Sequence, residues 1–184
     1  MKQTGRNKHL NTVVSCALLI AIELVLTRFC SLTLPTIRIG FGFAPIAVSG
    51  ILFGPVYGFA VGGISDLIGA NLFPSGPYHF GFTLVTALTG LVYGWLLHRK
   101  PGTPKWSRGK FIGRLCIALF INGFVLSLGL NTVWLMQLYD KAYMVLLVPR
   151  IVKEVIMCCV QFVVINMLQM VLVERILRSR PAIG

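Results

Sequence analysis

Residues 53–95 read FGPVYGFAVGGISDLIGANLFPSGPYHFGFTLVTALTGLVYGW, and this stretch decides the fold class. Only Asp66 and His79 in it ionise near neutrality, while Gly and Pro interrupt it at 54–55, 62–63 and 74–77. The pattern predicts apolar segments joined by tight, uncharged turns. A soluble protein with so many apolar residues would have too few polar side chains to form its water-exposed surface. In a bilayer, by contrast, each segment can be a helix whose backbone hydrogen bonds are all made within the helix. The stretch therefore predicts the centre of a membrane protein.

The composition of the whole chain supports this fold class. Of its 184 residues, 56% are hydrophobic and 12% are charged, which lies outside the range of soluble domains. A spanning helix takes about 20 residues, so the length allows about six spans in one integral membrane domain, residues 1–184. We predict an all-α membrane protein, a bundle of six transmembrane helices with irregular outer loops.

The predicted spans follow from where apolar runs end. The first begins near Asn11, and we keep it as a helix instead of a cleaved signal peptide, because its apolar run is long and has no AxA-type cleavage site. Residues 31–42 contain Pro35 and are predicted to form a loop, and residues 131–149 are predicted to form a partly structured outer loop because polar and aromatic residues mix there. The second and third spans are short for a bilayer, so we expect them to tilt or to cross incompletely. The six spans cover about residues 11–30, 43–53, 56–73, 79–97, 111–130 and 150–172.

Positive charge predicts the orientation. The net charge of +12 would suggest nucleic acid for a soluble chain, but most of the 17 basic residues lie in tails and one short connection. Positive residues of this kind mark the cytoplasmic side of a membrane protein, so we predict no nucleic-acid partner. The predicted cytoplasmic segments are the N-terminal tail (1–11), the basic loop (98–110) and the C-terminal tail (173–184), which puts both termini of a multi-pass protein inside the cell.

Five basic residues remain once Arg114, just after the basic loop, is also assigned to the cytoplasmic side. They are Arg28, Arg38, Lys141, Arg150 and Lys153. The positive-inside rule does not explain an Arg on the outer half of a bundle. Four of the five residues, all except Lys141, are predicted to lie at helix ends or in loops around that outer half. We therefore expect them to surround an anion that enters from outside.

Motifs of enzymes and metal sites are absent from the sequence. It contains no HExxH, no GxSxG, no paired carboxylates within a span and no CxxC pair, so we predict no catalytic residue, no metal site and no cofactor. A self-sufficient secondary transporter stays open as an alternative. Such proteins usually show internal repeats and mid-membrane carboxylates, and Glu23, Asp66 and Glu154 are the candidates here, without a convincing repeat. Asp66, in a glycine-rich helix, is interpreted as structural.

Aromatic residues gather at the level of the outer loops. Phe41 and Tyr78 follow the first and second loops, and Trp134 lies in the third. An interfacial aromatic belt explains such residues in nearly all membrane proteins. For Trp134, between Asn131 and Gln137, stacking on a planar ligand is an equally good interpretation, because neighbouring amides can read the edge of a ring.

Several motifs carry a resemblance to a known family. They are Arg38-Ile-Gly-Phe-Gly-Phe-Ala-Pro, Phe53-Gly-Pro-Val-Tyr-Gly, Asp66-Leu-Ile-Gly, Leu72-Phe-Pro-Ser-Gly-Pro-Tyr, Gly81-Phe-Thr-Leu and Thr89-Gly-Leu-Val-Tyr-Gly. Together they resemble the substrate-binding S components of energy-coupling factor (ECF) vitamin transporters. Asn131-Thr-Val-Trp134 and Pro149-Arg-Ile-Val-Lys153 resemble most closely the folate-specific members. The resemblance runs from the first predicted helix to the sixth.

The resemblance implies a high-affinity folate binder of the bacterial cell membrane that works without a transport engine of its own. S components join a transmembrane coupling (T) subunit and two cytoplasmic ATPases and are thought to topple in the bilayer to release the vitamin. Independently, this sequence lacks a GxxxxGK[ST] phosphate loop, so ATP hydrolysis must occur on another chain. Ala17 and Ala21 lie four apart, and the resemblance implies that this pair docks on the T subunit. An S component for a different vitamin stays open as an alternative.

Folate has a flat pterin, an aminobenzoyl ring and a glutamate with two carboxylates. Because Arg binds a carboxylate through paired hydrogen bonds, we predict that the three arginines contact the carboxylates or the pterin edge and that Lys153 adds charge. Trp134 and an aromatic residue would flank the rings. The full set predicted to bind the substrate is Arg28, Arg38, Phe41, Tyr78, His79, Asn131, Trp134, Arg150 and Lys153.

Overall fold

The computed structural model describes residues 2–33, 38–74, 78–99, 106–139 and 143–173. In chain order they form α1 (Lys2–Arg28), β1 (Ser31–Thr33), β2 (Arg38–Gly40), α2 (Phe43–Phe53), α3 (Pro55–Leu72), α4 (Phe80–Leu97), α5 (Arg108–Phe120), η1 (Ile121–Leu130), α6 (Asn131–Tyr139), α7 (Tyr143–Leu168) and η2 (Gln169–Val173), where η marks a π-helix. The prediction of a helical membrane bundle is confirmed.

Four helical stretches of the described residues have the length and hydropathy to cross a membrane. They are His9–Arg28, Phe80–Leu97, Arg108–Leu138 and Pro149–Val171. By contrast, α2 has 11 residues and rises roughly 16 Å, about half the hydrocarbon thickness of a bilayer. The prediction that the second span is short is therefore confirmed, and six complete crossings stay a prediction.

The first and fifth helices begin earlier than predicted. α1 is helical from Lys2, so the expected tail of residues 1–11 continues the first helix, because no proline precedes Asn11 to break it. α5 begins at Arg108, inside the expected basic loop, of which residues 100–105 lie outside the described part of the chain. A helix can continue from the bilayer into water, so the charged residues at the start of α1 and α5 can be helical outside the membrane.

Residues 31–33 and 38–40 form a pair of strands where a loop was expected, and residues 34–37 lie outside the described part of the chain. β1 and β2 pair antiparallel, with Ser31 opposite Gly40 and Thr33 opposite Arg38. Short β-favouring runs on both sides of a proline-containing connection explain the pairing. Gly40 permits the close approach, since a Cβ there would lie 2.6 Å from the Cβ of Ser31.

For residues 131–139 and 143–149 the prediction of an outer loop was wrong, and residues 140–142 lie outside the described part of the chain. α6 continues directly from η1 and ends at Tyr139, and α7 begins at Tyr143, with Pro149 inside it. No Gly or Pro occurs between Gly129 and Pro149, so no helix-breaking residue opposes helix formation in residues 131–139 or 143–148. Polar residues such as Asn131 were mistaken for a loop signal, although they lie on a helix.

Glycines bring α2, α3 and α4 into backbone contact. A Cβ on Gly62 of α3 would lie 2.5 Å from the Thr86 carbonyl oxygen of α4, and a Cβ on Gly50 of α2 would lie 2.7 Å from the Gly94 nitrogen. Small residues at these crossings permit such packing in membranes. Gly54, between α2 and α3, has φ 101°, a conformation that L residues rarely adopt.

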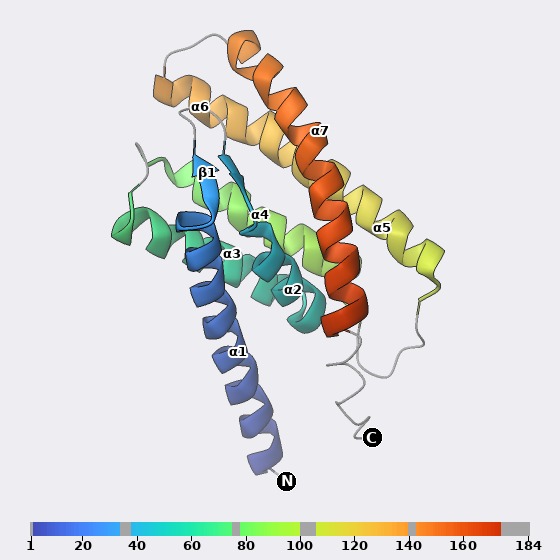
Figure 1. Ribbon diagram of the computed structural model, residues 1–184. Coiled ribbons are helices and arrows are strands. Elements are labelled where there is room, and N and C mark those ends of the chain that lie inside the picture. The colour runs from blue at the N-terminus through green and yellow to red at the C-terminus, as the bar shows by residue number, and fades with distance from the viewer. Residues whose placement is uncertain (1, 34–37, 75–77, 100–105, 140–142, 174–184) are drawn as a thin grey trace.

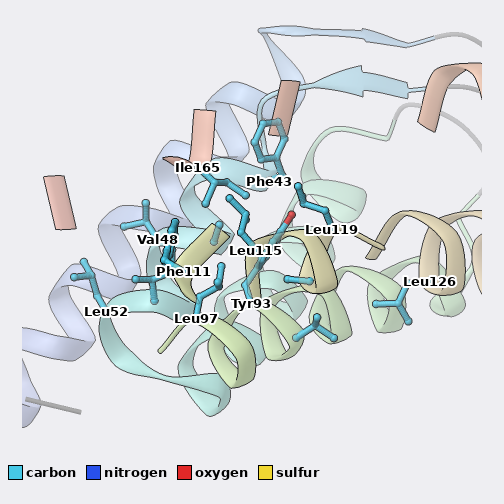
Figure 2. Close-up of a cluster of buried hydrophobic side chains, with 14 of the residues drawn as sticks. Phe43, Val48, Leu52, Tyr93, Leu97, Phe111, Leu115, Leu119, Leu126 and Ile165 are labelled. Carbon is cyan, nitrogen blue, oxygen red and sulfur yellow. The ribbon is translucent and has the colours of Figure 1, made fainter. Parts of the chain in front are cut away.

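The apolar core lies between α2, α4, α5 and α7 (Figure 2). Tyr93 and Leu115 are fully buried at its centre, together with Ala47 and Ile165. One end of the bundle, which we call the hairpin end, carries β1, β2, α6 and the start of α7, and the first turns of α1 point to the opposite end (Figure 1). The core therefore holds α7, whose start lies at the hairpin end, against α2, α4 and α5.

Candidate ligand-binding site

His79 and Trp134 form a stacked pair between the start of α4 and α6. Their ring centroids are 5.1 Å apart and the planes are inclined by 24°. His79 is the N-cap of α4, where its Nδ1 accepts a hydrogen bond of 3.0 Å from the Gly81 backbone N–H. An Nδ1 acceptor assigns the proton of the neutral ring to Nε2. His79 thus holds a defined tautomer and orientation beside Trp134.

Gly81 makes room for this pair. A Cβ at position 81 would lie 2.5 Å from Cδ2 of Trp134, closer than any real contact. The indole therefore packs directly on the first turn of α4, with His79 against its face. The glycine of the motif Gly81-Phe-Thr-Leu is explained here by packing against Trp134, a side chain 53 residues away in sequence.

Asn131 and Trp134 carry buried polar atoms that have no hydrogen-bond partner within the described part of the chain. These are the amide oxygen of Asn131 and the indole Nε1–H of Trp134. Residues three apart lie on the same face of a helix, so an acceptor and a donor occur side by side on α6. Buried polar atoms are nearly always satisfied, which makes this face of α6 suited to an incoming polar ring edge.

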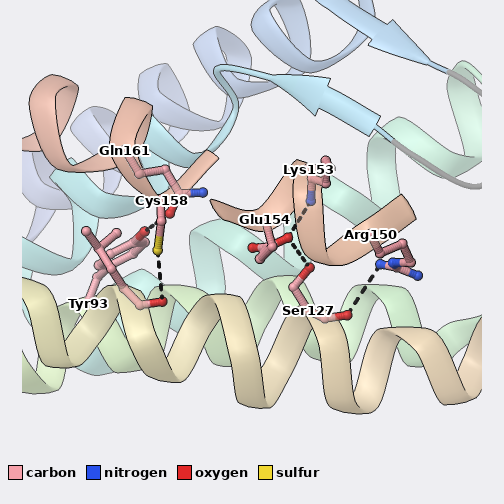
Figure 3. Close-up of polar contacts among 8 residues, drawn as sticks. Tyr93, Ser127, Arg150, Lys153, Glu154, Cys158 and Gln161 are labelled. Atoms are coloured by element: carbon pink, nitrogen blue, oxygen red, sulfur yellow. Dashed lines mark hydrogen bonds and ion pairs between the residues drawn. The ribbon is translucent and has the colours of Figure 1, made fainter. Parts of the chain in front are cut away.

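Arg150 and Lys153 lie on α7 opposite η1 (Figure 3). Arg150 is 4% exposed, and its Nη2 donates a hydrogen bond of 3.3 Å to the Ser127 carbonyl oxygen. Lys153 forms an ion pair of 2.7 Å with Glu154, which also accepts a hydrogen bond of 3.0 Å from the Ser127 hydroxyl. Two predicted site residues are thus brought together, with two partners that were not predicted.

Arg28 lies on another side of the hairpin end, at the end of α1. A Cβ on Gly69 of α3 would lie 2.7 Å from its Nη2, so the guanidinium packs on a glycine of α3. Nearby, Glu23 is buried and accepts a hydrogen bond of 2.5 Å from Thr27. α1 packs on α2 and α3, whereas α7 packs on η1, α5, α6 and α2. Arg28 and Arg150 thus lie on different helices that share α2 as a neighbour.

Tyr78 is exposed but tethered. Its hydroxyl lies 2.7 Å from the Thr83 hydroxyl, which donates a hydrogen bond of 2.6 Å to the Asp66 carboxylate. Because the single proton of Thr83 goes to Asp66, Tyr78 is the donor to Thr83. The chain joins α4 to α3 and agrees with the structural interpretation of Asp66.

Phe41 and Arg38 are the remaining predicted residues. Phe41 is exposed at the start of α2, with its ring 6.3 Å from that of Phe43. The backbone of Arg38 pairs with Thr33 in the hairpin, and its side chain lies outside the described residues. All nine predicted positions occur at or near the hairpin end, on six different elements or their edges.

Ala17 and Ala21 lie elsewhere, on α1. Both are exposed, and of the apolar window of α1 only 11% is buried inside the molecule. The pair therefore lies on a surface that the rest of the chain leaves open.

Sequence reasoning missed Ser127 as a site residue and weighed Glu154 only as a carboxylate that couples ions. The spacing Arg150, Lys153 and Glu154 was a usable signal, because residues three and four apart share a helix face. No sequence signal marked Ser127, since its placement depends on the π-helical geometry of η1.

Comparison with known families gives one match over nearly the whole chain. The family described as ECF-type riboflavin transporter, S component, matches residues 7–178.

Among characterised relatives, the folate transporter FolT of Clostridium novyi (strain NT) is 40% identical over 158 residues, which cover 86% of this chain and 87% of that protein. FolT of Leuconostoc mesenteroides subsp. mesenteroides is 27% identical over 155 residues, or 80% of this chain and 78% of that protein.

Two solved structures share the fold. A crystal structure of FolT bound with folic acid has a TM-score of 0.71 and 29% identity, covering 82% of this chain and 86% of that chain. The S component of a bacterial ECF transporter has a TM-score of 0.66 at 23% identity, covering 94% and 99%; this second likeness concerns the fold alone.

Proposed function

Because the chain belongs to the S components of ECF transporters, we propose that it is the folate-binding subunit of an ATP-dependent vitamin uptake system. It captures folate at the hairpin end, which faces outward, and both termini lie in the cytoplasm. A T subunit and two ATPase subunits supply the transport step. Relatives named folate transporters support the choice of ligand.

One observation carries the choice of folate within the family. The buried donor and acceptor of Trp134 and Asn131 occur at the same end of the bundle as the basic pair Arg150 and Lys153. The first pair suits the edge of a flat heterocycle, and the second suits a carboxylate. Folate combines both groups in one molecule.

Riboflavin is the second candidate, because the matching family is described by that vitamin. Its isoalloxazine has a flat edge with donors and acceptors, but riboflavin carries no carboxylate. The planar fork of the Arg150 guanidinium on α7 suits a carboxylate, a group that riboflavin lacks. The basic pair therefore favours folate.

Arg28, Arg38, Phe41, Tyr78 and His79 complete the proposed site. Arg28 and Arg38 approach from α1 and the hairpin and provide further contacts to the carboxylates or the pterin edge. Phe41 and Tyr78 flank the rings on the open side, and His79 supports Trp134 from behind. The site is thus closed by elements from both halves of the chain.

A secondary transporter is disfavoured by the carboxylates. Asp66 is hydrogen-bonded to Thr83, Glu23 to Thr27, and Glu154 to Ser127 and Lys153. Each has a structural partner, so none of them is needed as an ion-coupling group. Uptake by vesicles that contain this chain alone and an ion gradient would support the alternative.

Titration of the detergent-purified protein with folic acid and with riboflavin, followed by isothermal calorimetry, tests the proposal. We expect tight binding of folic acid and weaker or no binding of riboflavin. Arg150→Ala and Trp134→Ala should both weaken folic acid binding. Arg108→Ala and Trp95→Phe, which change exposed residues far from the hairpin end, are matched controls. Unchanged affinity in both site variants refutes the assignment.

A further inference from the structure

Glu154 is a buried carboxylate at the edge of the proposed site. It is 4% exposed, and its Oε2 accepts hydrogen bonds from the Lys153 ammonium at 2.7 Å and the Ser127 hydroxyl at 3.0 Å. A buried charge is tolerated only when it is paired and hydrogen-bonded. Both conditions are met by these two contacts (Figure 3).

The facing π-helix is shaped around this carboxylate. Gly123 of η1 lies opposite Glu154, and a Cβ there would be 3.3 Å from both Cγ and Oε1 of the glutamate. Ser127, four residues later in η1, supplies the hydroxyl. π-Helical segments often occur at functional sites, and here the segment presents a space and a donor to the same side chain.

Ser127 also connects Arg150 to the network. Its hydroxyl binds Glu154 and its carbonyl oxygen accepts from Arg150 Nη2 at 3.3 Å. Both basic residues of α7 are therefore connected to Ser127 of η1. Arg150 is hydrogen-bonded to it directly, and Lys153 is connected to it through Glu154. A change at Glu154 affects the placement of Lys153 first and, through Ser127, that of Arg150.

We propose that Glu154 is a positioning residue for anion capture: it holds Lys153 and Ser127 so that the basic pair meets the ligand carboxylate already oriented. The inference rests on the proposed function. An ammonium has three donors, so Lys153 keeps its bond to Glu154 and still binds a second carboxylate. Without Glu154, the largely buried ammonium loses its counter-charge, and its flexible stem turns toward water.

The test compares two ligands on two proteins. The ligands are folic acid and its diamide, in which both glutamate carboxylates are replaced by amides, and the proteins are the wild type and Glu154→Gln. We expect Glu154→Gln to bind folic acid about tenfold more weakly, as loss of a charge-assisted contact predicts, and to bind the diamide within about twofold of wild type. Glu154→Asp, which keeps the charge but shortens the reach, should fall between them for folic acid.

If Glu154 only stabilised the fold, its substitution would weaken the binding of both ligands equally. Equal weakening of both ligands in Glu154→Gln overturns the proposal, and so does tighter binding of folic acid, which means that Glu154 repels the ligand. Tyr93→Phe removes another buried hydrogen bond onto α7, from Tyr93 to Gln161 at 3.1 Å, and serves as the control for general loosening. It should leave the ratio of the two affinities unchanged.

A second measurement does not depend on folate. The acetylation rate of Lys153 by acetic anhydride, followed by mass spectrometry, should rise severalfold in Glu154→Gln because the ion pair no longer protects the amine. An unchanged rate overturns the positioning role. If wild-type protein fails to bind folic acid but the labelling result holds, the proposed ligand is wrong and the role of Glu154 in orienting Lys153 stands.

Discussion

The imidazole of His79 stacks on the indole of Trp134 at 5.1 Å while its Nδ1 caps helix α4. One side chain therefore has two separable tasks, and substitutions can divide them. Asn is a good N-cap but has no ring, whereas Phe has a ring but cannot cap.

We expect His79→Asn to keep the stability of the protein and to weaken folic acid binding, because Trp134 loses the ring behind it. Stacking contributes about 0.5–1.5 kcal/mol, which corresponds to about two- to tenfold in Kd. His79→Phe should show the reverse, with affinity better kept and a lower Tm. Calorimetry and thermal unfolding in detergent check both. Equal affinities for the two variants would contradict the role of the stack.

Gly81→Ala should displace the indole of Trp134. The added Cβ would lie 2.5 Å from the ring, and overpacking of this kind costs about 1–3 kcal/mol. We expect weaker folic acid binding together with a shift in tryptophan fluorescence. Gly113→Ala on α5, where a Cβ meets nothing within 4 Å, is the matched control and should leave both unchanged. A fluorescence spectrum that is the same in Gly81→Ala would argue against this packing.

Arg150→Lys should weaken folic acid binding although the charge is kept. Lys cannot reproduce the planar fork with which Arg binds a carboxylate, and the hydrogen bond from Nη2 to Ser127 is lost. The loss of a charge-assisted bond is worth about 1.5–3 kcal/mol, or roughly ten- to a hundredfold in Kd. Calorimetry with folic acid and its diamide measures it. Similar losses for both ligands would mean that Arg150 does not read the carboxylates.

Ala17→Leu should abolish uptake without changing binding. Both Ala17 and Ala21 are exposed on α1, and a bulky side chain prevents the close approach that small residues allow between helices. The measurement is uptake of radiolabelled folic acid by vesicles that contain this chain, a T subunit and both ATPase subunits. Leu18→Phe, one position along the same exposed helix, is the control. Normal uptake by Ala17→Leu would remove this pair from the proposed interface.

Some features of the fold and of the site could be predicted from the sequence alone, because charge and hydropathy reveal them directly. The membrane class followed from the long run in which only Asp66 and His79 ionise, because a bilayer tolerates few charges. Arg150 and Lys153 were identifiable as candidates for the same reason, since each basic residue in an apolar helix needs an explanation.

The features that the sequence did not predict share a physical cause. Each depends on a contact with a residue in another part of the chain. Asn131 was assigned to a loop because polar residues mark loops in soluble proteins, whereas here its polarity belongs to a buried face of α6. The chain from Tyr78 through Thr83 to Asp66 and the role of Ser127 depend on how helices face one another. Neither composition nor spacing shows which faces of the helices contact one another.

The contact of α3 with α4 gives the last prediction, which concerns stability instead of binding. Gly62→Ala should destabilise the bundle, because the added Cβ would lie 2.5 Å from the Thr86 carbonyl oxygen, and a backbone atom in a helix cannot give way. We expect a loss of about 1–3 kcal/mol and a lower Tm in detergent. Gly109→Ala, whose Cβ would meet nothing within 4 Å, is the control and should be neutral or slightly stabilising, since Ala favours helix over Gly. A Gly62→Ala protein as stable as the control would mean that α3 and α4 are farther apart than described, and α4 would then no longer present His79 to Trp134 as it does here.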